Sequence, residues 1–207
     1  MNRSLWTLFG FVLAVFVWSG IHPHDYFTWM LEVAPAVIAA VVLYFTRKKF
    51  PLTQLAYILI CIHALVLMVG GHYTYAEVPL GEWMKSWFDF ERNHYDRIGH
   101  LAQGFIPAII VREILVRTSP LKKGMWLPVI CCSICLSISA FYELIEWWVA
   151  LLSKTAAESF LGTQGDNWDT QADMLMAFIG AVFALTLLSH FHQKQINRLT
   201  KKISNQS

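Results

Sequence analysis

Acidic and histidine side chains recur at helical spacing within apolar stretches of this chain. Asp96 and His100 are four residues apart and Glu143 and Glu146 are three apart, so each pair shares one face of a helix. A carboxylate in an apolar helix is costly unless it is protonated, paired or in contact with water, so it is a candidate for function. One of two neighbouring carboxylates in a dry pocket can have a raised pKa, which acid–base catalysis requires. Glu143 and Glu146 are therefore the candidate catalytic residues.

A third pair, Asp169 and Asp173, repeats the four-residue spacing where the last apolar stretch begins. Carboxylate oxygens together with an imidazole nitrogen suit a divalent ion such as Mg, Mn or Zn. We therefore predict a divalent metal as cofactor, with four candidate ligands: His100, Asp173, Asp96 and Asp169. Candidate supporting residues lie in or next to the same polar clusters: His72, Tyr73, Gln103 and Asp166.

The same residues also have a structural interpretation. A salt bridge such as Arg97 with Asp169 would make part of the cluster a contact between helices, and Asp166 would be a solvated loop charge. His63, alone in the middle of an apolar stretch, is expected to be a hydrogen-bonded packing residue. The remaining histidines are expected in solvent or among lipid headgroups: His22, His24, His190 and His192. Convergence of the side chains in space would separate the two interpretations.

The composition indicates that lipid surrounds the elements that carry these residues. Of 207 residues, 56% are hydrophobic and only 14% are charged, and the mean hydropathy is +0.46. These values exceed those of an ordinary soluble domain. Because a spanning helix needs about 20 apolar residues, the sequence predicts one all-α membrane domain over residues 1–207. Its six spans are expected at 5–20, 27–46, 54–71, 98–116, 126–152 and 173–189, and an interfacial helix is expected at 80–90.

The basic residues predict the orientation of these spans, because cytoplasmic loops are enriched in Lys and Arg. With both termini in the cytoplasm, all but four of the 16 basic residues face inward, the exceptions being Lys85, Arg92, Arg97 and Lys154. The inward group is Arg3, Arg47, Lys48, Lys49, Arg112, Arg117, Lys122, Lys123, Lys194, Arg198, Lys201 and Lys202. The candidate site then lies on the outer side, and Glu113 is the one carboxylate on the inner side.

The basic residues also bear on nucleic-acid binding, and the first apolar run has an alternative interpretation. The basic residues are divided among separate loops, so no nucleic-acid-binding patch is expected. The first apolar run ends in Val17-Trp18-Ser19, which resembles the end of a signal peptide. A bulky Trp18 beside the cut favours a retained first span over a cleaved one.

Four runs of residues carry a resemblance to a known family. They are His72-Tyr73-x-Tyr75, Asn93-His94-Tyr95-Asp96-Arg97-x-x-His100, Phe141-Tyr142-Glu143-x-x-Glu146-Trp147-Trp148 and Gly165-Asp166-x-x-Asp169-Thr170-Gln171-x-Asp173-Met174. Together they resemble the YjdF family of bacterial inner-membrane proteins, and the resemblance covers essentially the whole chain. It implies a multi-pass protein of the bacterial inner membrane and supplies no reaction.

A more distant resemblance is to VanZ-like membrane proteins. Their pattern is matched by Asp96-Arg97-x-x-His100, by Glu143, and by Asp173 with Gly180. The chain departs from it by carrying Glu146 where the pattern has glutamine and Ala177 where it has asparagine. This resemblance implies a connection with the cell envelope and with glycopeptide-antibiotic tolerance.

Three classes of function are consistent with these residues. The first is binding of, or metal-assisted or acid–base action on, an envelope lipid or a lipid-linked substrate, with membrane lipids as partners. The second is a proton- or cation-coupled transporter in which Glu32, Glu143 and Glu146 carry protons or cations. The third is a non-catalytic membrane protein whose polar residues hold the helices together. The first is the most concrete prediction, and whether the protein is an enzyme stays open.

Overall fold

The computed structural model of the protein describes residues 3–121, 124–152 and 164–205, which form helices and short loops without a strand. The helices are α1 (Arg3–Ser19), α2 (Tyr26–Thr46), α3 (Gln54–Tyr73), the 3-10 helix η1 (Tyr75–Glu77), α4 (Pro79–Phe88), α5 (Tyr95–Thr118), α6 (Trp126–Leu152) and α8 (Asp169–Ser204). The predicted all-α fold is confirmed. Lys122, Lys123 and Lys154, which entered the prediction of orientation, lie outside the described residues.

Within the described ranges, five helices are long and apolar enough to cross a membrane: α2, α3, α5, α6 and α8. α1 is apolar but shorter, so the predicted count of six spans stays a prediction. α8 is much longer than the predicted span at 173–189, because its helix continues through polar residues at both ends. The expected interfacial segment at 80–90 forms α4, a separate ten-residue helix.

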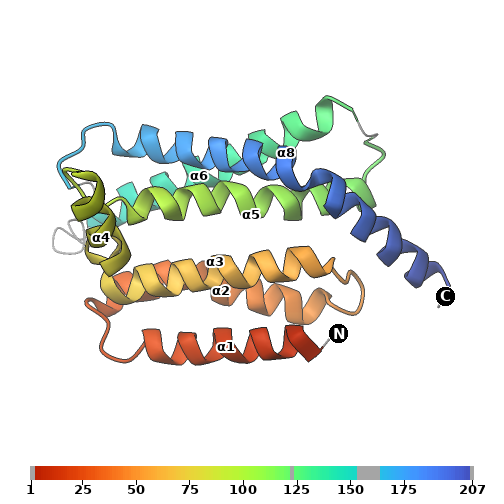
Figure 1. Cartoon of the computed structure of the whole chain (residues 1–207), viewed down its shortest axis with the longest axis horizontal. Helices are drawn as coiled ribbons and strands as arrows, with labels where there is room; N and C mark the ends of the chain where they lie inside the picture. Colours follow the sequence, from red (N-terminus) through yellow and green to blue (C-terminus); the bar gives the residue numbers. More distant parts are fainter. Residues whose placement is uncertain (1–2, 122–123, 153–163, 206–207) are drawn as a thin grey trace.

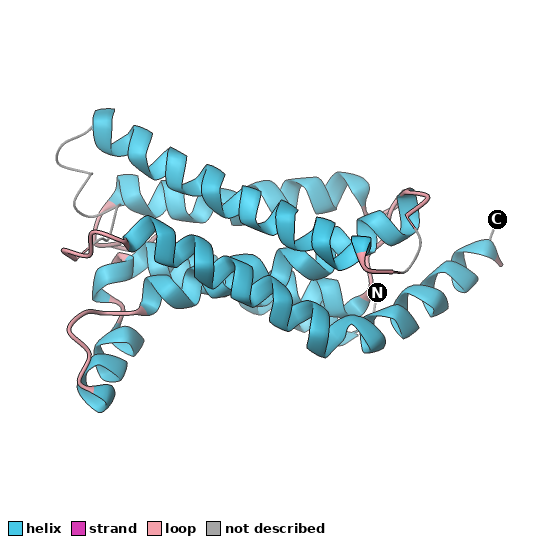
Figure 2. Ribbon diagram, turned by 90° about the horizontal axis from the view of Figure 1, so that it is seen from above, coloured by secondary structure: helices cyan, strands magenta, loops and turns pink. Residues whose placement is uncertain are grey.

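The long helices lie side by side and run along a common direction, and α4 lies across one end of the bundle (Figure 1). Both chain termini lie toward the other end, as an even number of crossings would require. Seen from above, the last turns of α8 project away from the other helices (Figure 2). Which end faces the cytoplasm stays a prediction from the basic residues.

Side-chain caps fix where two of the spans begin. The Asp25 carboxylate accepts a hydrogen bond from the Thr28 N–H at 2.7 Å before α2, and Thr53 accepts one from the Ala56 N–H at 3.4 Å before α3. Each cap satisfies an N–H that has no partner within its own helix. Asp89 ends α4 in the left-handed conformation, with a φ of 54°.

The α5 and α8 helices form the most extensive helix contact in the structure. A Cβ atom at Gly104 of α5 would lie 1.7 Å from the carbonyl oxygen of Ala177, and one at Gly180 of α8 would lie 2.1 Å from that of Leu101. Small residues thus let the two backbones touch, as at other close helix contacts in membranes. A stripe of small residues on α8 is buried: Ala177, Gly180, Ala181 and Ala184. This contact positions the candidate site.

Candidate functional site

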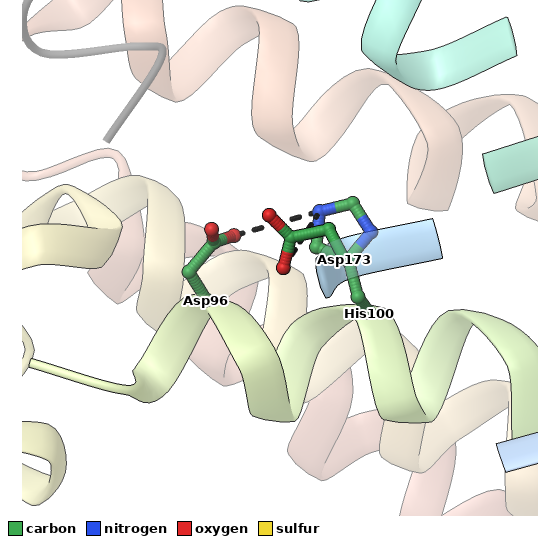
Figure 3. A group of neighbouring side chains, drawn as sticks. All are labelled: Asp96, His100 and Asp173. Atoms are coloured by element: carbon green, nitrogen blue, oxygen red, sulfur yellow. Dashed lines mark ion pairs between the residues drawn. The ribbon is translucent and has the colours of Figure 1, made fainter. Parts of the chain in front are cut away.

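Three predicted carboxylates, from α5, α6 and α8, lie around the Nε2 atom of His100. Asp96 and His100 come from α5, Asp173 comes from α8, and one ligand atom of each lies within 4.8 Å of the other two (Figure 3). The Nε2 atom lies 3.6 Å from an Asp96 oxygen, 4.0 Å from an Asp173 oxygen and 3.6 Å from an oxygen of Glu143 on α6. His100, Asp173 and Glu143 are buried, and the Asp96 side chain is 13% exposed. We call these four residues the His100 cluster.

Two arginines hold the remaining acids beside this cluster. The Arg97 guanidinium pairs with Asp173 and, at 2.7 Å, with Asp169. Arg92 pairs with the same Asp169 oxygen at 2.6 Å, and both arginines contact Asp166 at 3.3 and 3.0 Å. Asp169, a candidate metal ligand, is therefore held by two arginines outside the His100 cluster. The salt bridge between Arg97 and Asp169 that the sequence suggested is present.

The loop before α8 is tied to the start of α5. Asn93 and Gln164 exchange hydrogen bonds, each of 2.9 Å, through the Asn93 backbone and the Gln164 side chain. Asp166 accepts a 2.9 Å hydrogen bond from the Trp168 N–H. That hydrogen bond and the two neighbouring arginines lower the pKa of Asp166 below its ordinary value. The loop is thus fastened to the arginines that hold Asp169.

A cavity of about 230 Å³ adjoins the His100 cluster and is bounded by residues of α2, α3, η1, α5 and α6. Asp96 and His100 lie in its wall, and its other polar lining residues are Glu32, His63, Tyr75, Gln103, Tyr142 and Glu146. The Tyr142 hydroxyl donates a 3.0 Å hydrogen bond to Glu32. Gln103 and Glu146, which the sequence singled out, thus lie at the cavity. Tyr142 was missed as a lining residue, although it stands directly before Glu143.

The predicted supporting residues His72 and Tyr73 lie elsewhere. The His72 Nδ1 atom is 3.0 Å from the Ser19 carbonyl oxygen, and the ring lies 4.3 Å from that of Trp18. The Tyr73 ring lies 6.1 Å from the Trp18 ring. Both residues contact the end of α1, and neither lines the cavity or belongs to the His100 cluster. Their described contacts tie α3 to α1.

A second buried polar group surrounds Glu113 and corrects one expectation. Glu113 Oε1 accepts hydrogen bonds from the Thr53 N–H (2.9 Å) and Arg117 (2.8 Å), and its Oε2 accepts one from the Thr53 hydroxyl (2.7 Å) and lies 3.0 Å from His192 Nε2. We call these four residues the Glu113 network. His192 was expected in solvent or headgroups but is fully buried, because α8 continues beyond the predicted span and keeps this residue against α5.

The expectation for His63 differs from the structure as well. His63 lines the cavity, and its Nε2 atom is buried without a hydrogen-bond partner among the described residues. It is therefore not the hydrogen-bonded packing residue that its isolation in the sequence suggested. His22, His24 and His190 are exposed, as expected.

Negative charge exceeds positive charge around the site. The carboxylates are Glu32, Asp96, Glu143, Glu146, Asp166, Asp169 and Asp173, and the arginines among them are Arg92 and Arg97. Unpaired buried charge is costly, so protons or bound cations must neutralise the excess. Two ligands of one metal ion, each about 2.1 Å from it, lie roughly 3–4 Å apart. The spacing around His100 Nε2 falls within that range, so the cluster can hold a cation.

The comparisons with known proteins agree with a membrane location. Residues 4–194 match the family described as "Predicted membrane protein (DUF2238)". The chain is 47% identical over 198 residues to the "Inner membrane protein YjdF" of Escherichia coli (strain K12), covering 96% of this chain and 93% of that protein. No solved structure matches the chain. The several apolar helices and these matches identify a multi-pass protein of the inner membrane. The chain belongs to the DUF2238 family of predicted membrane proteins, and the resemblance to YjdF proteins seen in the sequence is confirmed.

Proposed function

We propose that the protein binds a divalent cation through Asp96, His100 and Asp173 and thereby binds, or acts on, an envelope lipid or a lipid-linked substrate. One observation carries the proposal: a ligand atom of each of these three side chains lies within 4.8 Å of the other two. An imidazole nitrogen with two carboxylates is a donor set that Zn, Mn and Mg accept. The excess of carboxylates around the group supports the same conclusion.

Arg97 supports this assignment by fixing a ligand. It holds Asp173 and pairs with Asp169 at 2.7 Å, so the Asp173 carboxylate is oriented before a cation arrives. Ligating carboxylates are commonly held by such neighbouring groups, and their loss weakens metal binding. Asp169 acts through Arg97 in this arrangement and is a positioning residue.

Glu143 is the proposed general base. Its carboxylate lies 3.6 Å from His100 Nε2 and therefore borders any ion that His100 would bind. A bound divalent cation polarises a phosphoryl or carbonyl oxygen and lowers the pKa of a water molecule. Glu143 is placed to accept the proton of such a water, while Glu146, on the same face of α6, lines the adjoining cavity.

The test is a measurement of metal content and metal affinity. Full-length protein purified in detergent is expected to contain or bind Mn²⁺ or Zn²⁺ by elemental analysis and titration calorimetry. His100→Ala and Asp173→Asn are expected to weaken binding by about 10- to 100-fold or more, with His190→Ala, an exposed histidine of the same helix as Asp173, as the matched control. Wild-type protein that neither contains nor binds a divalent metal would refute the assignment.

A second candidate, a proton- or cation-coupled transporter, is supported by two prolines and a buried carboxylate in the cavity wall. Its lining includes Pro35 and Pro107, which lie inside α2 and α5, together with the buried Glu32. Proline removes one backbone hydrogen bond within a helix, and both helices continue past it; ionisable groups near irregular helix positions are common in transporters. Protein reconstituted in vesicles would then move protons, and Glu143→Gln would abolish that flux.

A further inference from the structure

The cavity beside the His100 cluster is rich in hydrogen-bond acceptors and has no basic side chain other than histidine. Carboxylates of Glu32, Asp96 and Glu146 line it, and neither Lys nor Arg does. The described hydrogen bond of Glu32 comes from the neutral hydroxyl of Tyr142. An anionic group such as a phosphate would be repelled from this lining, whereas a cation would be attracted.

Three buried polar atoms of cavity-lining residues have no partner among the described residues, and His63 Nε2 is one of them. His100 is 4% exposed, and its Nδ1 atom makes no hydrogen bond. The Oε1 atom of Gln103, one turn deeper on α5, is buried and makes none either. Buried polar atoms are almost always hydrogen-bonded, so unpartnered ones beside a cavity point to a ligand or ordered water within it.

The cavity also approaches the lipid-facing surface of the bundle. α2 packs against α3, whereas α6 packs against α5 and α8, and the cavity lies between these two groups of helices. Ile138 of α6 lines the cavity and is nevertheless 41% exposed. The hydrogen bond from Tyr142 to Glu32 joins α6 to α2 across the same region. A group entering from the bilayer would therefore meet Tyr142 and Glu32.

We propose that this cavity binds a primary ammonium group between Glu32, Glu146 and Tyr142, as the headgroup of an aminophospholipid or a free small amine would supply it. The inference rests on the proposed function, because it names the substrate class for the same site. The three N–H donors of a primary ammonium match the carboxylate, hydroxyl and amide acceptors of the lining. In a lipid, the phosphate would stay outside the cavity.

The size of the cavity agrees with this occupant. A water molecule takes about 30 Å³, so a cavity of about 230 Å³ has room for roughly seven or eight waters. An ethanolamine group, with four heavy atoms, fits together with a few waters. A bare metal ion or a single proton would leave most of this volume unexplained.

The test is binding of defined amines to full-length protein in detergent, followed by titration calorimetry and by the shift of the thermal unfolding midpoint. Methylammonium and ethanolamine are expected to bind saturably. Tetramethylammonium, which has no N–H donor, is expected not to bind, and neither is K⁺ when KCl is added at the same concentration. Glu32→Gln and Glu146→Gln are expected to weaken amine binding by about tenfold or more, since each removes a charge-assisted hydrogen bond. Glu91→Gln, at an exposed residue, is the control.

Two further arms separate the sources of the amine. Native mass spectrometry after exchange into phosphatidylethanolamine or phosphatidylcholine should show selective retention of the former if a lipid supplies the group. Retention of neither lipid, with binding of free ethanolamine, would support a soluble amine. Tyr142→Phe should weaken binding in either case, with Tyr26→Phe, at an exposed tyrosine, as its control.

Titration of Mn²⁺ on the same samples keeps this inference distinct from the metal site. If Mn²⁺ binds but neither amine nor aminophospholipid does, the ammonium site is overturned and the metal site stands. If amines bind while Mn²⁺ does not, the metal site is overturned. Equal binding of tetramethylammonium and methylammonium would also overturn the inference, because charge alone would then account for binding.

Discussion

The His100 cluster and the Glu113 network both combine histidine and carboxylate side chains of α5 and α8, and they differ in how completely they are hydrogen-bonded. Both oxygens of Glu113 have partners at 2.7–3.2 Å, and His192 is fully buried beside them. The Nε2 atom of His100 instead has three carboxylate oxygens at 3.6–4.0 Å, and its Nδ1 atom has no partner among the described residues. A donor or acceptor at 3.6 Å or beyond is not hydrogen-bonded.

This difference in hydrogen bonding assigns a structural role to the Glu113 network and a ligand-binding role to the His100 cluster, although both contain histidine and carboxylates. A complete network leaves no atom for a ligand, so the Glu113 network acts as a contact that fixes α3, α5 and α8. An incomplete cluster with excess negative charge is stable only when a cation or proton completes it. Substitutions should therefore affect stability at Glu113 and ligand binding at His100.

The largest effect is expected for Glu113→Ala. Removal of this carboxylate leaves Arg117 and His192 without their buried partner, which costs about 3–5 kcal/mol of unfolding free energy. Chemical or thermal unfolding of purified protein in detergent measures it, with Glu91→Ala as the exposed control. A loss below about 1 kcal/mol would mean that the network does not stabilise the fold.

Gly104→Ala is expected to damage both regions at once. The new Cβ atom would lie 1.7 Å from the Ala177 carbonyl oxygen, so α5 and α8 would be pushed apart at a cost of about 3 kcal/mol. Because both helices contribute to both polar groups, Mn²⁺ affinity should fall together with stability. Gly10→Ala is the matched control, since its Cβ atom would meet nothing within 4 Å. Unchanged Mn²⁺ affinity in a destabilised Gly104→Ala protein would contradict the shared scaffold.

A pair of histidine variants compares the two regions directly. His192→Ala should cost about 2 kcal/mol of stability, because Glu113 loses a buried hydrogen-bond partner. His100→Ala should change stability by less than about 1 kcal/mol in metal-free buffer, since no hydrogen bond of His100 is lost. The measurement is unfolding in detergent with a chelator present. The opposite ranking would reverse the assignment of structural and functional regions.

The smallest effect concerns acid stability at Asp166, outside the spans. Because its pKa is lower in the folded protein than in the unfolded chain, where it is close to 3.8, the ionised Asp166 carboxylate stabilises the fold above that pH. This stabilisation is lost as the pH falls through the pKa of the folded state. Asp166→Asn should remove that part of the pH dependence below about pH 4. The unfolding midpoint between pH 3 and 6 provides the measurement, with exposed Asp89→Asn as control. Identical profiles for wild type and Asp166→Asn would contradict the expectation.

The sequence predicts the helices and the convergence of residues at the site better than it predicts the individual ion pairs between side chains. Helical spacing and topology bring Asp96, His100 and Asp173 to one end of neighbouring spans, and the structure places them together. The same spacing leaves two roles open for Asp169, as a metal ligand or as the partner of Arg97, because the rotation of α8 about its axis is set by packing. That rotation depends on the contact of Gly104 with Ala177, which is visible only in three dimensions.

Helix boundaries limited the prediction at the other end of α8. A span was predicted to stop where hydropathy falls, at residue 189, but a helix does not end where its sequence becomes polar. The backbone continues to Ser204, so His192 stays on the buried face and reaches Glu113. Burial of a lone histidine beyond an apolar run has no signature in the sequence.

α8 also fixes the rotation, about its own axis, of the side chains at one end of the bundle relative to those at the other end. Its 36 residues correspond to a rod of about 54 Å, longer than the roughly 30 Å thickness of the hydrocarbon core. Asp173 and His192 lie on this single uninterrupted rod, 19 residues apart by their numbering. One residue inserted between them would turn everything beyond it by about 100°, so Asp173 and His192 could not both keep their partners. The register of one helix therefore couples the geometry of the two polar regions.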